Sequence, residues 1–127
     1  MRIIDSERGI PTTNLKRCVE FYTKVLGFTK LSESRGRVTV VLGSDQIVFR
    51  KGHKKEIESL RKIGFSLDFR ISGIREYYER VRASGKVKIT FDLELMQPGV
   101  WQFTLVDCNG YQVGFAMSVL SRRAARN

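Results

Sequence analysis

The sequence has few of the residues that build metal sites and disulfide frameworks. Its 127 residues include one histidine, two cysteines and two prolines. Cys18 and Cys108 lie far apart and lack the CxxC spacing of a zinc knuckle, so neither a disulfide framework nor a structural zinc site is indicated. We interpret both as free thiols. The single histidine, His53, stands in a polar GHKK segment, where we expect a solvated residue without a ligand role.

Long hydrophobic runs are also absent. The longest apolar segments are strand-sized, such as VTVVL at 38–42, whereas a membrane helix needs about 20 apolar residues. The N-terminal stretch MRIIDSERG has no apolar core of the kind found in signal peptides. We therefore expect a cytoplasmic protein with no membrane partner. A length of 127 residues with 42% hydrophobic content suits a single folded domain.

Acidic residues are too few to balance the basic ones. Lys and Arg total 23 against 13 Asp and Glu, which gives a formal charge of +10. This excess favours an anionic partner, and it belongs to the domain itself, because without the three arginines of the C-terminal SRRAARN the sum is still 20 minus 13, or +7. Nucleic acid is the less favoured partner, since we find no base-reading motif and no helix dense in Lys and Arg.

The apolar pattern divides the chain into two similar halves. In the first half it predicts a strand, a helix that begins after the cap residue Asn14 and ends at Gly27, and three strands, with the strands at 3–12, 28–32, 37–42 and 46–50. In the second half it predicts the same order, with a helix from Ile74 to the Ser84-Gly85 stop and strands at 64–71, 86–95, 101–106 and 111–117. The pattern thus predicts an α+β fold built on an internal repeat of about 55 residues.

These elements give a division of the chain. We predict one domain over residues 1–118, followed by a basic tail at 119–127. Within the domain, module one covers 1–51, a short helical linker covers 52–63, and module two covers 64–118.

Two stretches, PTTNLKRCVEFYTKVLGFTKL and GVWQFTLVDCNGYQVGF, resemble the signature regions of the vicinal oxygen chelate superfamily. That superfamily includes glyoxalase I, extradiol dioxygenases, fosfomycin-resistance enzymes and bleomycin-resistance proteins. The resemblance covers nearly the whole chain and implies two tandem βαβββ modules whose mixed sheet curls into a cleft. Members usually complete the cleft by pairing, so a homodimer is expected. We interpret the FY and LGF motifs at 21–28 as packing residues rather than as catalytic ones.

In this superfamily, function commonly depends on a divalent metal held by His and Glu side chains on the strands that face the cleft. The resemblance implies that four positions of this chain stand where those ligands would be: Glu7, Val48, Ser66 and Gly114. Only Glu7 among them is a good metal ligand, and a functional site needs about three. We therefore expect no metal cofactor, and we leave the question of catalysis open with a leaning toward no enzyme activity.

Among metal-free relatives, the bleomycin-resistance proteins are the most similar in sequence pattern. They share a proline in the first strand, here Pro11, and a proline, glycine and tryptophan before the penultimate strand, here Pro98, Gly99 and Trp101. Those proteins bind a cationic drug and are themselves acidic. A chain with a charge of +10 is expected to repel that ligand, so we carry over the mode of binding and not the ligand.

Strand alternation predicts which side chains face the cleft. All but one of the candidate ligand-binding residues lie on the alternate positions of their strands that face the cleft. Trp101 is the exception, and it is included because its ring could stack on a ligand at the cleft mouth. The candidates are Arg50, Ser66, Asp68, Arg70, Trp101, Gln102 and Gln112. Arginine presents a planar fork of donors that suits a carboxylate or phosphate. An ion pair of Asp68 with Arg50 or Arg70 would instead leave the cleft nearly neutral, and the sequence does not separate these alternatives.

The leading hypothesis is a metal-free protein that binds a small anionic or carbonyl-bearing molecule. The first alternative is a divergent metal-dependent lyase or dioxygenase-like enzyme, with a metal held by Glu7 together with Asp5 or Asp68 and with donors across a dimer interface. The second alternative is a basic module that binds nucleic acid or an acidic protein through its outer surface.

Overall fold

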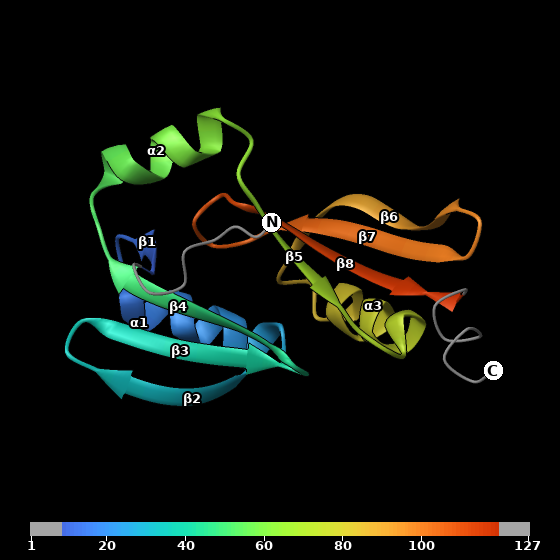
Figure 1. The fold of residues 1–127 in the computed structure, drawn as a ribbon, viewed down its shortest axis with the longest axis horizontal. Coiled ribbons are helices and arrows are strands. Elements are labelled where there is room, and N and C mark those ends of the chain that lie inside the picture. Colours follow the sequence, from blue (N-terminus) through green and yellow to red (C-terminus); the bar gives the residue numbers. More distant parts are fainter. Residues whose placement is uncertain (1–8, 120–127) are drawn as a thin grey trace. The chain divides into compact units, whose positions relative to one another are not determined.

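The computed structural model describes residues 9–119, and in them one arrangement of strands and helix occurs twice (Figure 1). The described residues form two compact units. The first contains the chain up to Phe65 together with the short segment Cys108–Tyr111, and the second contains Ser66–Asp107 and the chain from Gln112 onward. The domain boundaries expected from the sequence stay a prediction. No helix in the described range is long and apolar enough to span a bilayer.

The first unit is a four-stranded mixed sheet with the strand order β1-β4-β3-β2. β1 runs parallel to β4, and the other neighbours are antiparallel. Its elements, in chain order, are β1 (Ile10–Thr12), α1 (Leu15–Glu20), η1 (Phe21–Val25), β2 (Thr29–Ser34), β3 (Arg37–Leu42), β4 (Asp45–Lys51) and α2 (Lys54–Lys62). The predicted first strand was longer, and its part before Gly9 lies outside the described residues.

The first helix begins as the sequence predicts and then departs from a regular α-helix. The side chain of Asn14 caps it by accepting a hydrogen bond from the backbone N–H of Arg17 at 3.0 Å. From Phe21 the helix continues as the π-helical segment η1 up to Val25, and Gly27 then reverses the chain with a φ of 80°. The π-helical turns of η1, which are wider than those of an α-helix, were not predicted. The spacing of apolar residues does not distinguish an α-helix from a short π-helical segment.

The motif at 21–28 forms the core of this unit, as interpreted from the sequence. Tyr22 is fully buried, and its ring lies 5.2 Å from that of Phe28 and 4.8 Å from that of Phe49 on β4. These aromatic contacts fix the helix against one face of the sheet. On the opposite phase of β4, Gln46 is exposed and Val48 and Arg50 are half-buried.

The second unit repeats the arrangement with the order β5-β8-β7-β6, and β5 runs parallel to β8. Its elements are β5 (Ser66–Arg70), α3 (Ile74–Ala83), β6 (Lys88–Gln97), β7 (Val100–Val106) and β8 (Gln112–Ser118). The two equivalent sheets, each with a parallel pair formed by its first and last strands, confirm the predicted α+β fold class and the internal repeat.

Helix α3 packs its apolar stripe onto one face of the second sheet. Tyr77 lies 5.0 Å from Phe115, and Tyr78 lies 4.9 Å from Phe103, measured between ring centroids. Burial raises the pKa of the Tyr77 hydroxyl well above its ordinary range, so this phenol stays neutral in the core. The other face of the same strands carries no part of this aromatic cluster.

The two cysteines are free thiols, and the single histidine lies at the start of a helix. Cys18 is buried in α1, Cys108 is half-buried in the turn after β7, and neither forms a disulfide, which confirms the interpretation of both as free thiols. His53 is exposed and directly precedes α2. Its backbone N–H donates to the Glu56 carboxylate at 3.0 Å, so this residue contributes to the start of a helix through its main chain.

Candidate functional site

The second sheet presents a polar face on the side away from α3. On β5, Leu67 and Phe69 are buried, whereas Asp68, which lies between them, and Arg70, which follows Phe69, are exposed. This strict alternation confirms the phase that was read from the sequence. The face that includes Asp68 and Arg70 is called the open face of the second sheet below.

Strand register extends the open face across β8 and β7. Ser66 pairs with Gln112, Asp68 with Gly114 and Arg70 with Ala116, while Ala116 pairs in turn with Gln102. Because cross-strand partners point to the same side of a sheet, the predicted residues of this unit other than Trp101 share one face. They are Ser66, Asp68, Arg70, Gln102 and Gln112.

Hydrogen bonds between side chains hold part of this face in place. Thr90 on β6 donates its hydroxyl proton to the side-chain amide oxygen Oε1 of Gln112 at 3.0 Å, and the hydroxyls of Thr90 and Thr104 lie 2.7 Å apart. Thr90 was missed from the sequence as a residue of this face, since the pairing of β6 with β7 shifts register between Ile89 and Phe91. The alternation of side chains along a strand does not predict which face a residue occupies where the register shifts.

Asp68 is positioned by its neighbours on the same face. The hydroxyl of Ser66 donates to its Oδ2 at 3.0 Å. Its Oδ1 lies over β8, at 2.6 Å from the place where a β-carbon on Gly114 would stand. A side chain at that glycine would therefore occupy the space that the Asp68 carboxylate fills.

Arg50 belongs to the first unit, and its side chain is engaged in an ion pair. Its Nη2 donates to Glu56 Oε2 at 2.8 Å and its Nη1 to Oε1 at 3.3 Å, which is a two-pronged arrangement. The hydrogen bond from Arg50 and the backbone N–H of His53 together lower the pKa of the Glu56 carboxyl from 4.5 to about 2. The pKa of the Arg50 guanidinium is raised, chiefly by the same hydrogen bond.

This ion pair was not anticipated from the sequence. Arg50 pairs with Glu56 because the chain turns at Gly52 directly from β4 into α2 and brings the two side chains together. A β-carbon at Gly52 would lie 2.6 Å from Glu56 Oε1 and 2.6 Å from Pro11 Cβ, so this turn needs a glycine. The spacing of six residues across a strand–helix connection carries no simple sequence signal, which is why Glu56 was missed.

Trp101 does not lie with the other candidates of its unit. It is paired with Met117 in the phase of β7 that includes Phe103, and the guanidinium carbon of Arg75 on α3 lies 5.1 Å from its ring centroid. Trp101 lines a separate cavity of about 310 Å³ on the helix side of the sheet. Its indole thus contacts a cation of its own chain, on the side opposite to Gln102.

Of the four positions implied to hold a metal, the three that the structure describes do not supply the donors that a divalent metal needs. Val48 and Gly114 have no side-chain donor, Ser66 donates its hydroxyl to Asp68, and Glu7 lies outside the described residues. Within 9–119, no three His, Cys, Asp or Glu side chains gather as a metal site would require. This donor set does not fit the metal centre that the superfamily commonly uses.

No family model matches the chain, and no curated protein sequence matches it. Solved structures match its fold. TioX from Micromonospora sp. ML1 aligns with a TM-score of 0.70 and 17% identity over 86% of this chain and 94% of that chain. TnmS3, an antibiotic binding protein from Streptomyces sp. CB03234, aligns with a TM-score of 0.67 and 18% identity over 86% and 90% of the two chains.

A third similar structure is a member of the glyoxalase/bleomycin resistance protein/dioxygenase superfamily from Sphaerobacter thermophilus DSM 20745. It aligns with a TM-score of 0.64 and 24% identity over 86% of this chain and 92% of that chain. The chain therefore has the glyoxalase/bleomycin-resistance fold, as its two signature stretches predicted. At these identities the likeness establishes the fold, and function must be argued from the site.

Proposed function

We propose that this protein binds a small anionic or carbonyl-bearing molecule on the open face of the second sheet, without a metal cofactor. The observation that carries the proposal is the register that places Ser66, Asp68, Arg70, Gln102 and Gln112 on one side of three neighbouring strands. A set of polar groups fixed by sheet geometry is typical of a surface that orients a ligand.

Arg70 and the neutral donors give this face its preference for an anionic or carbonyl-bearing ligand. Arg70 is an exposed residue, and the donors of a guanidinium suit a carboxylate or a carbonyl oxygen. Asp68 already accepts a hydrogen bond from Ser66 and lies against Gly114, so its carboxylate is partly occupied within the protein. The formal charge of +10 adds a general attraction for anions.

The fold relatives support a binding role. TnmS3 is described as an antibiotic binding protein, which shows that this fold can serve to bind a small molecule. The residues at the superfamily's metal positions, Val48, Ser66 and Gly114, favour binding without metal chemistry. The proposal is thus a binding protein rather than a metal-dependent lyase or dioxygenase, with a cytoplasmic location and no membrane partner, and with nucleic acid as a disfavoured partner.

The test is a ligand screen followed by a charge reversal. Anionic and carbonyl-bearing metabolites are screened by the shift that they cause in the melting temperature, and the best binder is titrated into Arg70→Glu and Arg35→Glu. Arg35 is the matched control, because it is an exposed arginine in the turn between β2 and β3 of the first unit. We expect Arg70→Glu to weaken binding by about tenfold or more and Arg35→Glu to leave it nearly unchanged.

Two results would count against the proposal. If no anionic or carbonyl-bearing compound stabilises the protein, the ligand class is wrong. If a binder is found and its affinity is unchanged in Arg70→Glu, the site is not the open face of the second sheet.

We further propose that the protein acts as a homodimer that pairs along β6. This strand is at the edge of its sheet and carries large apolar side chains that are exposed to solvent: Phe91, Leu95 and Met96. An exposed apolar edge strand favours association with another chain, and pairing with a second copy would cover it.

A further inference from the structure

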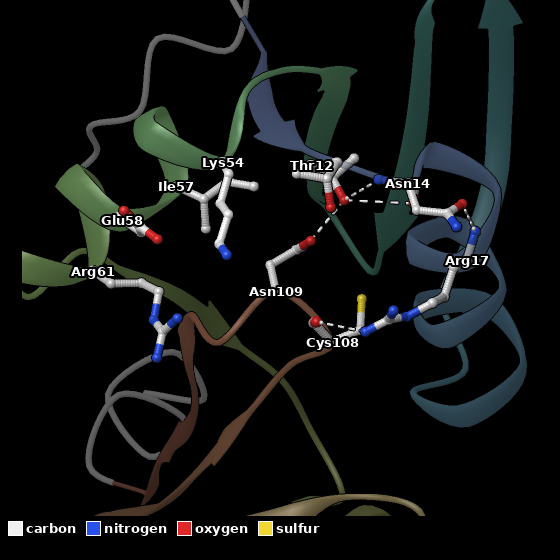
Figure 2. Close-up of a pocket in the computed structure, with 10 residues that line it drawn as sticks. Thr12, Asn14, Arg17, Lys54, Ile57, Glu58, Arg61, Cys108 and Asn109 are labelled. Carbon is white, nitrogen blue, oxygen red and sulfur yellow. Dashed lines mark hydrogen bonds between the residues drawn. The ribbon is translucent and has the colours of Figure 1, made fainter.

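The first unit contains a cavity of about 200 Å³ that is unrelated to the open face of the second sheet (Figure 2). It lies where the turn at Cys108–Tyr111 meets the start of α1 and one side of α2. Its wall is made largely of polar and charged side chains together with Ile57 and Cys108; the full set is Thr12, Thr13, Asn14, Arg17, Lys54, Ile57, Glu58, Arg61, Cys108 and Asn109.

Three cations line this cavity from two different helices. Arg17 comes from α1, and Lys54 and Arg61 come from α2. Glu58 is the one carboxylate of the described lining. In the part of the chain that the structure describes, none of the three cations forms a salt bridge. Three cations against one carboxylate leave the described lining with a formal charge of 3 minus 1, or +2, which favours an anionic occupant.

Both arginines contact the turn between β7 and β8, Arg17 through a hydrogen bond and Arg61 through packing. Arg17 Nη2 donates to the carbonyl oxygen of Cys108 at 3.1 Å. Arg61 packs over Gly110, where an added β-carbon would lie 2.9 Å from its Cζ, and Gly110 has a φ of 88° that also favours glycine. The turn thus has the shape that lets a guanidinium approach it closely.

Neutral groups in the wall are fixed as well. Thr12 donates its hydroxyl proton to Asn109 Oδ1 at 2.6 Å, and Asn109 Nδ2 lies 3.5 Å from Cys18 Sγ. Figure 2 shows the Lys54 ammonium group directed toward Asn109 from the α2 side. The cavity therefore combines a wall of neutral groups fixed by hydrogen bonds with three cationic side chains, around a space that suits a small molecule.

We propose that this cavity binds a small phosphate-bearing molecule, with Arg17, Lys54 and Arg61 as its cationic ligands. A dianionic oxyanion matches the net excess of positive charge in the wall, and arginine donors match its oxygens in pairs. Free phosphate and a phosphate monoester share this chemistry. The proposal does not depend on the ligand proposed for the second sheet.

Cys108 supplies a reporter inside the cavity. Its thiol lines the wall and is half-buried, whereas Cys18 is fully buried. Iodoacetate and iodoacetamide both react with the thiolate, which displaces iodide and forms a thioether. The ratio of their rates therefore cancels the intrinsic reactivity of the thiol and reports the preference of the cavity for an anionic reagent over a neutral one.

The experiment measures this ratio in the folded full-length chain and in the same chain unfolded in urea. We expect the ratio to be higher in the folded chain by on the order of threefold or more. Inorganic phosphate and glycerol 3-phosphate are then added at constant ionic strength, and each is expected to protect Cys108 in a saturable way. Stronger protection by glycerol 3-phosphate identifies a phosphate monoester as the ligand class, and equal protection identifies the phosphate group alone.

Neighbouring lysines on α2 provide matched controls. Lys54→Gln and Arg61→Gln are expected to lower the ratio and the protection, whereas Lys55→Gln and Lys62→Gln, which remove the same charge outside the lining, leave both nearly unchanged. The melting temperature of each variant shows that it is folded. The proposal is overturned if phosphate does not protect the wild-type thiol, or if the lining and control variants behave alike.

Discussion

The carboxylate of Asp68 lies over Gly114 of the neighbouring strand, with Oδ1 at 2.6 Å from the place where a β-carbon would stand. The resemblance described above implies that Gly114 stands where the superfamily commonly has a metal ligand, and Asp68 fills the space that a side chain at this position would need. The open face of the second sheet is therefore shaped by the absence of a side chain at one residue and by the presence of a carboxylate at another.

This contact predicts a coupling between the two residues. Gly114→Ala is expected to lower the free energy of unfolding by about 1 kcal/mol, because the Asp68 side chain must move and give up its hydrogen bond from Ser66. In an Asp68→Ala background, the same substitution is expected to cost much less. Urea denaturation of the four proteins in this cycle measures the coupling. Equal costs in both backgrounds would show that the strain at Gly114 does not come from Asp68.

The ion pair of Arg50 and Glu56 predicts a defined pH dependence. The pKa of Glu56 is about 2 in the folded protein and 4.5 ordinarily, so the contribution of its carboxylate to stability is present above pH 4.5 and is lost as the pH falls toward 2. Glu56→Gln is therefore expected to melt at a lower temperature than the wild type at pH 7. The difference should shrink between pH 4.5 and pH 2.

The control for this prediction is Glu20→Gln, which removes an exposed carboxylate from the end of α1. Its melting temperature should differ little from that of the wild type at any of these pH values. A Glu56→Gln deficit that stays constant down to pH 2 would show that the side chain acts by packing rather than by its charge.

The metal-free proposal predicts that the purified protein holds far less than one metal ion per chain. Protein prepared without a tag or chelator is challenged with nickel, cobalt, zinc and manganese, and its metal content is measured by plasma mass spectrometry. A stoichiometry near one that disappears in Glu7→Ala would favour the alternative of a metal-dependent enzyme. Asp5 and Asp68 would then be the next residues to substitute.

The proposed dimer predicts a mass near twice 14.6 kDa in size-exclusion chromatography with light scattering. Leu95, which is 53% exposed on β6, is expected to be part of the contact, so Leu95→Glu should shift the protein toward the monomer. Ile63→Glu is the control, because Ile63 is 77% exposed but lies outside any edge strand. A wild-type protein that stays monomeric at high concentration would contradict the proposal.

The sequence by itself determined the repeated βαβββ pattern and the faces of its strands. The alternation along 64–71 predicted the exposed phase of Asp68 and Arg70, and the apolar spacing after Asn14 and Ile74 predicted the two helices that cover the sheets. These features follow from the periods of strands and helices, which act between residues close in the chain. Element boundaries moved by a few residues, for example in β6, which runs from Lys88 to Gln97.

Only the tertiary structure decided which charged groups meet. The pairing of Arg50 with Glu56 depends on a close turn at Gly52, and the bond from Arg17 to Cys108 joins residues 91 positions apart. Such contacts require the path of the chain in space, and no local pattern specifies it. The phosphate site proposed in the first unit exists only because a turn of the second half of the sequence packs beside α1 and α2.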